Sequence, residues 1–161
     1  MTDSNSFSFA REPGSVPEAR AALARLEGQL PASAMYDASL CLSELVTNAV
    51  QHPGENAGDL LELTLTVTED GLRVQVADPG GAFQPGEPTE GDERGWGLFI
   101  VDQLASRWGS EPGEDRTVIW FEIDRAAAAA DEGGGHGAGQ DPRREEAADA
   151  IARLKLGRAI D

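Results

Sequence analysis

Two strand-like segments joined by a tight turn constrain the fold of this chain more than any other feature of its sequence. Residues 60–68 and 72–78 are rich in β-branched and aliphatic side chains, and Asp70-Gly71 lies between them. An Asp-Gly pair between two such runs is a strong signal for a tight hairpin turn. The sequence therefore predicts an antiparallel β-hairpin against which the other elements pack.

The second strand of this hairpin ends in an unusual place for a carboxylate. Because side chains alternate along a strand, Leu72, Val74, Val76 and Asp78 share one face, and that face is the more apolar one. A charge in such a position needs a partner that offsets its desolvation. Two interpretations stay open: Asp78 starts the Pro-Gly-Gly turn that follows it, or it accepts a hydrogen bond from the amino group of a ligand.

Apolar residues spaced three and four apart predict three helices. The first begins with Ser15 as its N-cap and is closed by Pro31. The second covers residues 34–51 and stops before a Pro-Gly pair, which is a clear helix breaker. The third covers residues 95–109 and opens on glycines. These helices provide enough amphipathic surface to cover one face of a small sheet.

Strand patterns and a change in composition define the expected domain. Residues 6–11 alternate as an edge strand would, and residues 117–124 are apolar on both faces, as in an interior strand. We expect one domain over residues 1–125. An Ala/Gly-rich segment, 126–141, has the composition of a flexible linker. The tail, 142–161, contains the pattern of a short amphipathic helix.

Composition excludes several classes of function. The net charge of −16 argues against nucleic acid or an anionic membrane as a direct partner, since both are negatively charged and attract positively charged proteins. Lys155 is the only lysine, and no Gly-Lys-Ser/Thr tripeptide is present, which excludes a P-loop. No run of 18 apolar residues exists, so we expect a soluble, cytoplasmic protein. The single cysteine, Cys41, lies among leucines and is expected to be a small buried thiol.

The second predicted helix carries a polar stripe. Glu44, Asn48 and His52 follow one another at intervals of four residues, so they lie near one line on the helix surface. Taken alone, the stripe has the pattern of the solvated face of an amphipathic helix. Asn48 fits that interpretation less well, because asparagine is a mediocre helix former that is better placed at caps. The stripe is therefore a candidate for polar chemistry.

The third predicted helix opens on a glycine pair. Gly95 and Gly97 allow close backbone approach, and the free N–H groups of the helix start would attract phosphate. The pattern does not extend to the dinucleotide-binding form, because Ile100 stands where a third glycine is required. A phosphate site without a Rossmann fold is thus the expectation.

The order of these motifs resembles the GHKL class of ATP-binding domains, and within it the small bacterial anti-sigma-factor serine kinases. The matching segments are "ELVTNAVQH", "VADPGGAF", "RGWGLFIVDQLASRWG" and "RTVIWFEI", and the resemblance covers residues 6–124. It implies a Bergerat-type two-layer α/β sandwich. In that fold a mixed β-sheet is covered on one face by helices, and a flexible ATP lid lies at residues 84–94.

The resemblance also implies roles for particular residues. Asn48 would offer its side-chain oxygen to Mg²⁺, and Glu44 would act as the base toward an acceptor hydroxyl. Asp78 would bind the adenine amino group with help from Thr117, whereas His52 would be structural. The remaining positions implied to border the base or the phosphates of ATP are Gly80, Ala82, Arg94, Gly95, Trp96, Gly97 and Leu98.

The implied activity is that of a serine kinase that binds a sigma factor and phosphorylates an antagonist protein; the family also allows a homodimer. Two positions depart from the family pattern. Ala82 stands in place of a glycine, and Trp96 stands where arginine is frequent. They keep a second hypothesis open, a nucleotide-binding module that sequesters a partner without phosphorylating it. A degenerate domain that binds no nucleotide is the third.

Overall fold

The fold is described from a computed structural model of the chain. The residues that the structure describes are 2–51, 58–79, 93–112 and 115–133, with the single positions 142, 146, 147 and 149. At 93–96, 112 and 131–133 only the backbone is described. Most of the segment expected to form the lid lies outside these residues.

Five strands form one open sheet in the order β1-β2-β3-β5-β4. All four neighbouring pairs are antiparallel, whereas a mixed sheet was expected. The connection from β3 to β4 passes through a helix, so these two strands run in the same direction. The hairpin return of β5 places it between them, which makes every neighbouring pair antiparallel. The strands are β1 (Asp3–Ala10), β2 (Leu60–Val67), β3 (Gly71–Pro79), β4 (Arg107–Pro112) and β5 (Arg116–Asp124).

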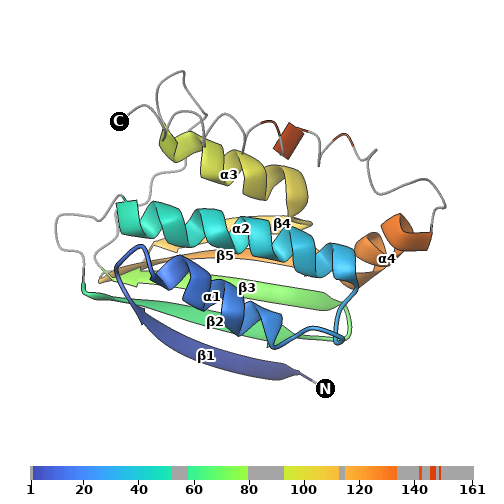
Figure 1. The fold of residues 1–161 in the computed structure, drawn as a ribbon, viewed down its shortest axis with the longest axis horizontal. Helices are drawn as coiled ribbons and strands as arrows, with labels where there is room; N and C mark the ends of the chain where they lie inside the picture. The colour runs from blue at the N-terminus through green and yellow to red at the C-terminus, as the bar shows by residue number, and fades with distance from the viewer. Residues whose placement is uncertain are drawn as a thin grey trace.

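Helices cover one face of the sheet, as Figure 1 shows, and the two-layer α/β architecture is confirmed. They are α1 (Ser15–Ala24), α2 (Ala32–Gln51) and α3 (Glu93–Leu104), with α4 (Arg125–Gly133) at the end of the sheet. The long helix α2 lies between α1 and α3 and contacts both. None of the described helices is long and apolar enough to cross a membrane.

The core lies between the helices and the inner face of the sheet. Strand register places Val74 between Leu65 on β2 and Phe121 on β5, and all three side chains are at most 1% exposed. Alternation along the strands therefore puts one apolar face inward, as the sequence predicts. The hairpin at Asp70-Gly71, the edge position of β1 and the interior position of β5 are all confirmed.

The first helix is shorter than predicted, and its cap differs. Ser15 is the first residue of α1 and Gly14 is the N-cap; the Ser15 hydroxyl donates instead to the Glu12 carbonyl, at 2.6 Å. The helix ends at Ala24 rather than near Pro31. Beyond it Gly28 adopts a φ of +84°, a left-handed conformation that a glycine reaches without strain and that interrupts a right-handed helix.

The third helix is also shorter than predicted, because its expected second half contains a strand. The helix α3 ends at Leu104, and β4 then pairs with β5 along its whole length. Arg107 in β4 is held by ion pairs with Glu122 and Asp124 of β5. Pairing with a distant strand has overridden the helical spacing of the sequence, which is a local signal.

The segment expected to be a linker starts with a helix. Residues of α4 follow β5 directly, and Ala128 is 6% exposed. The hydroxyl of Ser33, in α2, donates to the Ala128 carbonyl at 3.0 Å, which ties α4 to the body of the domain. In the tail, the described position Ala147 is 1% exposed. The rest of the expected linker lies outside the described residues.

Candidate functional site

The helix α2 holds the first two candidate residues. Its buried side includes Leu45, Val46 and Ala49, whereas Glu44 and Asn48 are half-buried and lie one turn apart. The Oε2 atom of Glu44 is buried. The polar stripe is therefore not an ordinary solvated face, because part of it packs inside the molecule.

Cys41 lies on the buried side of α2 with no exposed surface, as expected. Burial raises the pKa of its thiol, and the carboxylates of Asp37 and Glu44 raise this pKa further. Since the thiolate is the reactive form, this cysteine is a packing residue rather than a nucleophile.

Asn48 touches the backbone of α3. A Cβ atom built on Gly97 would lie 2.5 Å from Nδ2 of Asn48 and 3.3 Å from its Oδ1. Real Cβ contacts do not occur at 2.5 Å, so only glycine at position 97 lets α3 approach the amide this closely. The close approach thus joins two motifs that are far apart in the sequence.

Asp78 lies near the end of β3, on the side of the sheet that faces the helices. It is 9% exposed, and its register partner on β5 is Thr117, which is 6% exposed. The prediction that a carboxylate ends the apolar face of this strand is confirmed. The strand register places Asp78 beside Thr117; the role expected of both residues in adenine binding stays a prediction.

The partner of Asp78 is Arg11, which the sequence interpretation did not identify. The guanidinium Nη2 donates to Oδ1 of Asp78, and the two side chains form an ion pair that is only 9% and 13% exposed. Arg11 follows β1 directly and is 67 residues away from Asp78. The need of a buried carboxylate for a partner was a usable signal, but the sequence did not show which residue would meet it.

Arg11 also binds three backbone carbonyls around Asp78. Its Nη1 donates to Ala49 at 2.6 Å, its Nε donates to Gly58 at 2.8 Å, and its Nη2 lies 3.4 Å from the Pro79 carbonyl. Ala49 is within the last turn of α2, where carbonyls have no intrahelical partner. A cation at this position satisfies one of them and interacts favourably with the negative end of the helix.

The candidate residues gather at one side of the molecule. Figure 1 shows the C-terminal end of α2, the N-terminal end of α3 and the end of β3 on the left of the view. The positive end of α3 therefore faces the part of α2 that carries Asn48. The first four N–H groups of a helix have no intrahelical acceptor, and in α3 these belong to residues 93–96.

Other predicted site residues are only partly described. Gly95 and Trp96 lie in the first turn of α3, which begins at Glu93, so the glycine pair is inside the helix rather than before it. The backbone of Arg94 belongs to the same turn, while its side chain is outside the description. Leu98 is 4% exposed and part of the core. His52, Gly80 and Ala82 lie outside the described residues.

Comparison with known proteins gives matches over most of the domain. A family model described as the histidine kinase-like ATPase domain matches residues 9–123. An uncharacterized protein of Streptomyces coelicolor is 35% identical over 85 residues, which are 50% of this chain and 79% of that protein.

A solved structure shares the fold. It contains the RsbU and RsbW domains of Rv1364c from Mycobacterium tuberculosis, with a TM-score of 0.59 at 20% identity. The match covers 76% of this chain, which spans only 32% of the length of that structure. At this identity the likeness concerns the fold alone.

Proposed function

This chain belongs to the histidine kinase-like ATPase family, and we propose that it is an anti-sigma factor with serine kinase activity on an antagonist protein. A sigma factor and that antagonist are its proposed partners. The family implies a nucleotide site that takes ATP. The finer assignment rests on the resemblance of the four motifs to the anti-sigma serine kinases and on the arrangement of Glu44, Asn48 and Asp78.

One observation carries the proposal: Asn48 lies directly against Gly97, so the helix with the polar stripe meets the start of the helix with the free amides. An amide oxygen is a suitable ligand for Mg²⁺, which prefers oxygen ligands and keeps phosphate oxygens in its shell. Helix amides at the start of α3 suit phosphate. The residues present therefore fit ATP with Mg²⁺, which would supply charge neutralisation at the phosphates.

The proposed chemistry assigns each polar residue a separate task. Glu44, one turn before Asn48, accepts the proton of the seryl hydroxyl while that oxygen forms its bond to the γ-phosphorus and the bond to ADP breaks. Asn48 would hold Mg²⁺ by its side-chain oxygen, and the ion would neutralise charge at the phosphates. Asp78 accepts a hydrogen bond from the adenine amino group with the help of Thr117. Arg94, Gly95, Trp96, Gly97 and Leu98 would border the phosphates, and Gly80 and Ala82 the base.

A second candidate function is a nucleotide-binding module that sequesters its partner without phosphorylating it. Ala82 and Trp96 favour this candidate, because each replaces a residue that is frequent in the kinases. Loss of an arginine at position 96 removes a cation from a chain that has only one lysine. The two candidates share the adenine site and differ in γ-phosphate transfer.

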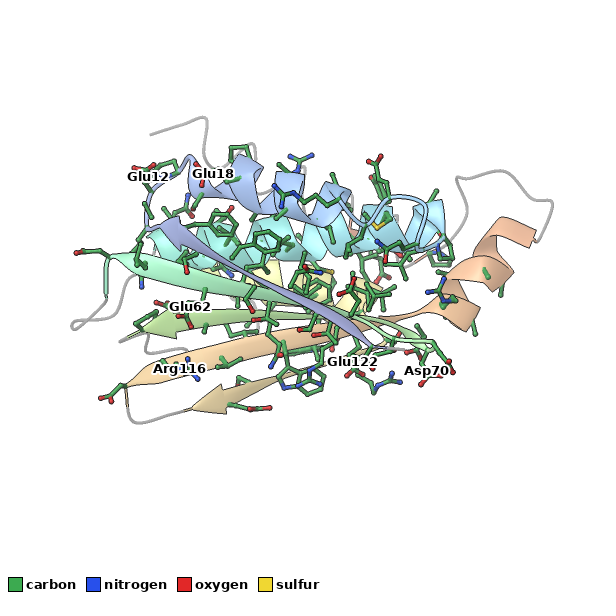
Figure 2. All side chains as sticks on the ribbon, turned by 90° about the horizontal axis from the view of Figure 1, so that it is seen from below. Glu12, Glu18, Glu62, Asp70, Arg116 and Glu122 are labelled. Carbon is green, nitrogen blue, oxygen red and sulfur yellow. The ribbon has the colours of Figure 1, made fainter. Side chains whose placement is uncertain are left out.

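A phosphate-transfer assay separates the two candidates. The chain is incubated with labelled ATP, Mg²⁺ and the antagonist encoded by a neighbouring gene, and Glu44→Gln is compared with wild type and with Glu18→Gln. Glu18 is an exposed residue of α1, labelled in Figure 2. We expect label transfer by wild type and Glu18→Gln and at least a hundredfold slower transfer by Glu44→Gln. Transfer that survives in Glu44→Gln would rule out its role as the base, and nucleotide binding without transfer by wild type would favour the module.

The adenine site is tested by nucleotide binding. We expect Asp78→Asn to lose ATP binding: if the amide oxygen accepts from Arg11, the amide nitrogen presents donors to the adenine amino group, which is itself a donor. Asp70→Asn is the matched control. Figure 2 shows Asp70 at the opposite end of the sheet from Arg116, the neighbour of Thr117. Retained binding in Asp78→Asn would mean that the adenine pocket lies elsewhere.

A further inference from the structure

Within the described part of the chain, Asp78 forms its ion pair with Arg11, a residue to which the proposed function assigns no role. Its side chain is 9% exposed and reaches Asp78, Ala49, Gly58 and Pro79 at once. Guanidinium groups carry five N–H donors in a rigid planar fork. Because its donors bind these four acceptors, the guanidinium is held in one orientation, and the carboxylate it binds is held with it.

We infer that Arg11 is a positioning residue for base recognition: it orients the Asp78 carboxylate so that this group accepts a hydrogen bond from the exocyclic amino group of a purine nucleotide. The inference rests on the proposed function, in which Asp78 is the adenine acceptor. It adds a residue that lies outside all four motifs and a reason for selectivity between purines.

The carboxylate of Asp78 can accept more than the one hydrogen bond that Arg11 donates to it. A carboxylate has two oxygens and about four lone-pair positions, and Arg11 donates to Oδ1. Pairing with Arg11 compensates the negative charge of Asp78, which would otherwise be costly in a site that is 9% exposed. An ionised carboxylate accepts hydrogen bonds and donates none. It therefore favours an amino group at C6 of the purine, as in ATP, over the carbonyl oxygen of ITP.

The same contacts place Arg11 between the two segments that flank the site. Its Nη1 binds the last turn of α2 next to Asn48, and its Nε binds Gly58, whose own N–H donates to the Pro79 carbonyl at 3.0 Å. Arg11 thereby holds the end of α2 and the end of β3 at a fixed separation. The amide proposed to bind the metal and the carboxylate proposed to bind the base are positioned by one side chain.

The test is the ratio of affinities for ATP and ITP, measured by calorimetry on the full chain. Wild type should prefer ATP by at least about tenfold, the range expected for a hydrogen bond to a charged group. In Arg11→Met the preference should fall below about threefold. Arg11→Lys keeps the charge but not the fork, so its ratio should lie between these values. Arg107→Met removes an arginine from exposed ion pairs on the other face of the sheet and should keep the wild-type ratio.

Each outcome decides the inference. An unchanged ratio in a folded Arg11→Met protein would overturn it and make Arg11 a purely structural residue. Should Arg11→Met fail to fold, Arg11→Lys decides: a ratio below that of wild type supports the inference, and an unchanged ratio overturns it. Absence of ATP binding by wild type would remove the proposed function together with this inference. ATP binding with an unaffected ratio would remove the inference alone.

Discussion

Two clusters of ion pairs lie on opposite faces of the same sheet, and they differ in how far they are buried and therefore in how strongly water screens their charges. On the inner side, Arg11 and Asp78 form a pair that is 9% and 13% exposed. On the outer side, Arg107 binds Glu122 and Asp124, and Arg73 binds Glu122, with Arg107 54% exposed. Figure 2 shows Glu122 on the side of the sheet away from the helices. Water screens the outer cluster, whereas the inner pair is shielded from solvent, so its electrostatic interactions are stronger.

The largest expected effect comes from breaking the inner pair. Arg11→Met leaves the carboxylate of Asp78 buried without its cation and should lower the free energy of unfolding by about 3 kcal/mol. Urea denaturation measures this change. Replacing both partners, Arg11→Met with Asp78→Leu, should recover most of the loss, because no buried charge remains. A double variant as unstable as Arg11→Met would show that packing, and not charge, explains the loss.

The next largest effect concerns the contact between α2 and α3. Gly97→Ala forces the Asn48 amide to move, because the new Cβ would lie 2.5 Å from Nδ2. We expect about tenfold weaker binding of ATP with Mg²⁺, or about 1.4 kcal/mol. The higher helix propensity of alanine, about 1 kcal/mol over glycine, should offset part of the strain in the free protein. The control measures ATP binding by calorimetry in an Asn48→Ala protein. Adding Gly97→Ala to that protein should weaken ATP binding no further, and an additive loss of affinity would contradict the proposed contact.

A smaller effect is expected from the outer cluster. Arg107→Met removes the arginine whose pKa is raised by hydrogen bonds with Asp124 and Glu122. Because this guanidinium is exposed, the free energy of unfolding, measured by urea denaturation, should fall much less than in Arg11→Met. The fall should vanish in about 1 M salt, where the Debye length is about 3 Å. A decrease of the size seen for Arg11→Met would remove the distinction between the two clusters.

The smallest effect concerns how the contribution of Glu122 to the unfolding free energy changes with pH. Hydrogen bonds from Arg73 and then Arg107 hold the pKa of its carboxyl below the ordinary value of 4.5. A carboxyl with a lowered native pKa contributes stability above its unfolded pKa and loses it as the pH falls through the native value. Wild type should therefore exceed Glu122→Gln in unfolding free energy at pH 6, and the difference should shrink below about pH 4.5. A difference that grows on acidification would contradict the assignment.

Local patterns predicted much of the fold. The hairpin at Asp70-Gly71, the long helix α2 and the two-layer architecture depend on periodicity and turn chemistry, which are properties of short segments. The strand β4 was missed because "SRWG" continues a helical spacing, and only pairing with β5 makes it a strand. The helix α4 was missed because alanine-rich composition does not distinguish a linker from a helix until Ala128 packs against a neighbour.

The candidate site also combines features that the sequence predicts with contacts that only the tertiary structure shows. The sequence by itself determined that Glu44 and Asn48 lie one turn apart and that Asp78 ends the apolar face of a strand, since helix and strand periods fix such relations over a few residues. Only the tertiary structure decided that Asn48 lies against Gly97 and that Arg11 neutralises Asp78. Those contacts join residues 49 and 67 positions apart: the packing of α2 against α3 brings Asn48 to Gly97, and the sheet order β1-β2-β3 brings Arg11, which follows β1, within reach of Asp78 on β3. A desolvated charge requires a partner, and the tertiary packing determines which residue that partner is.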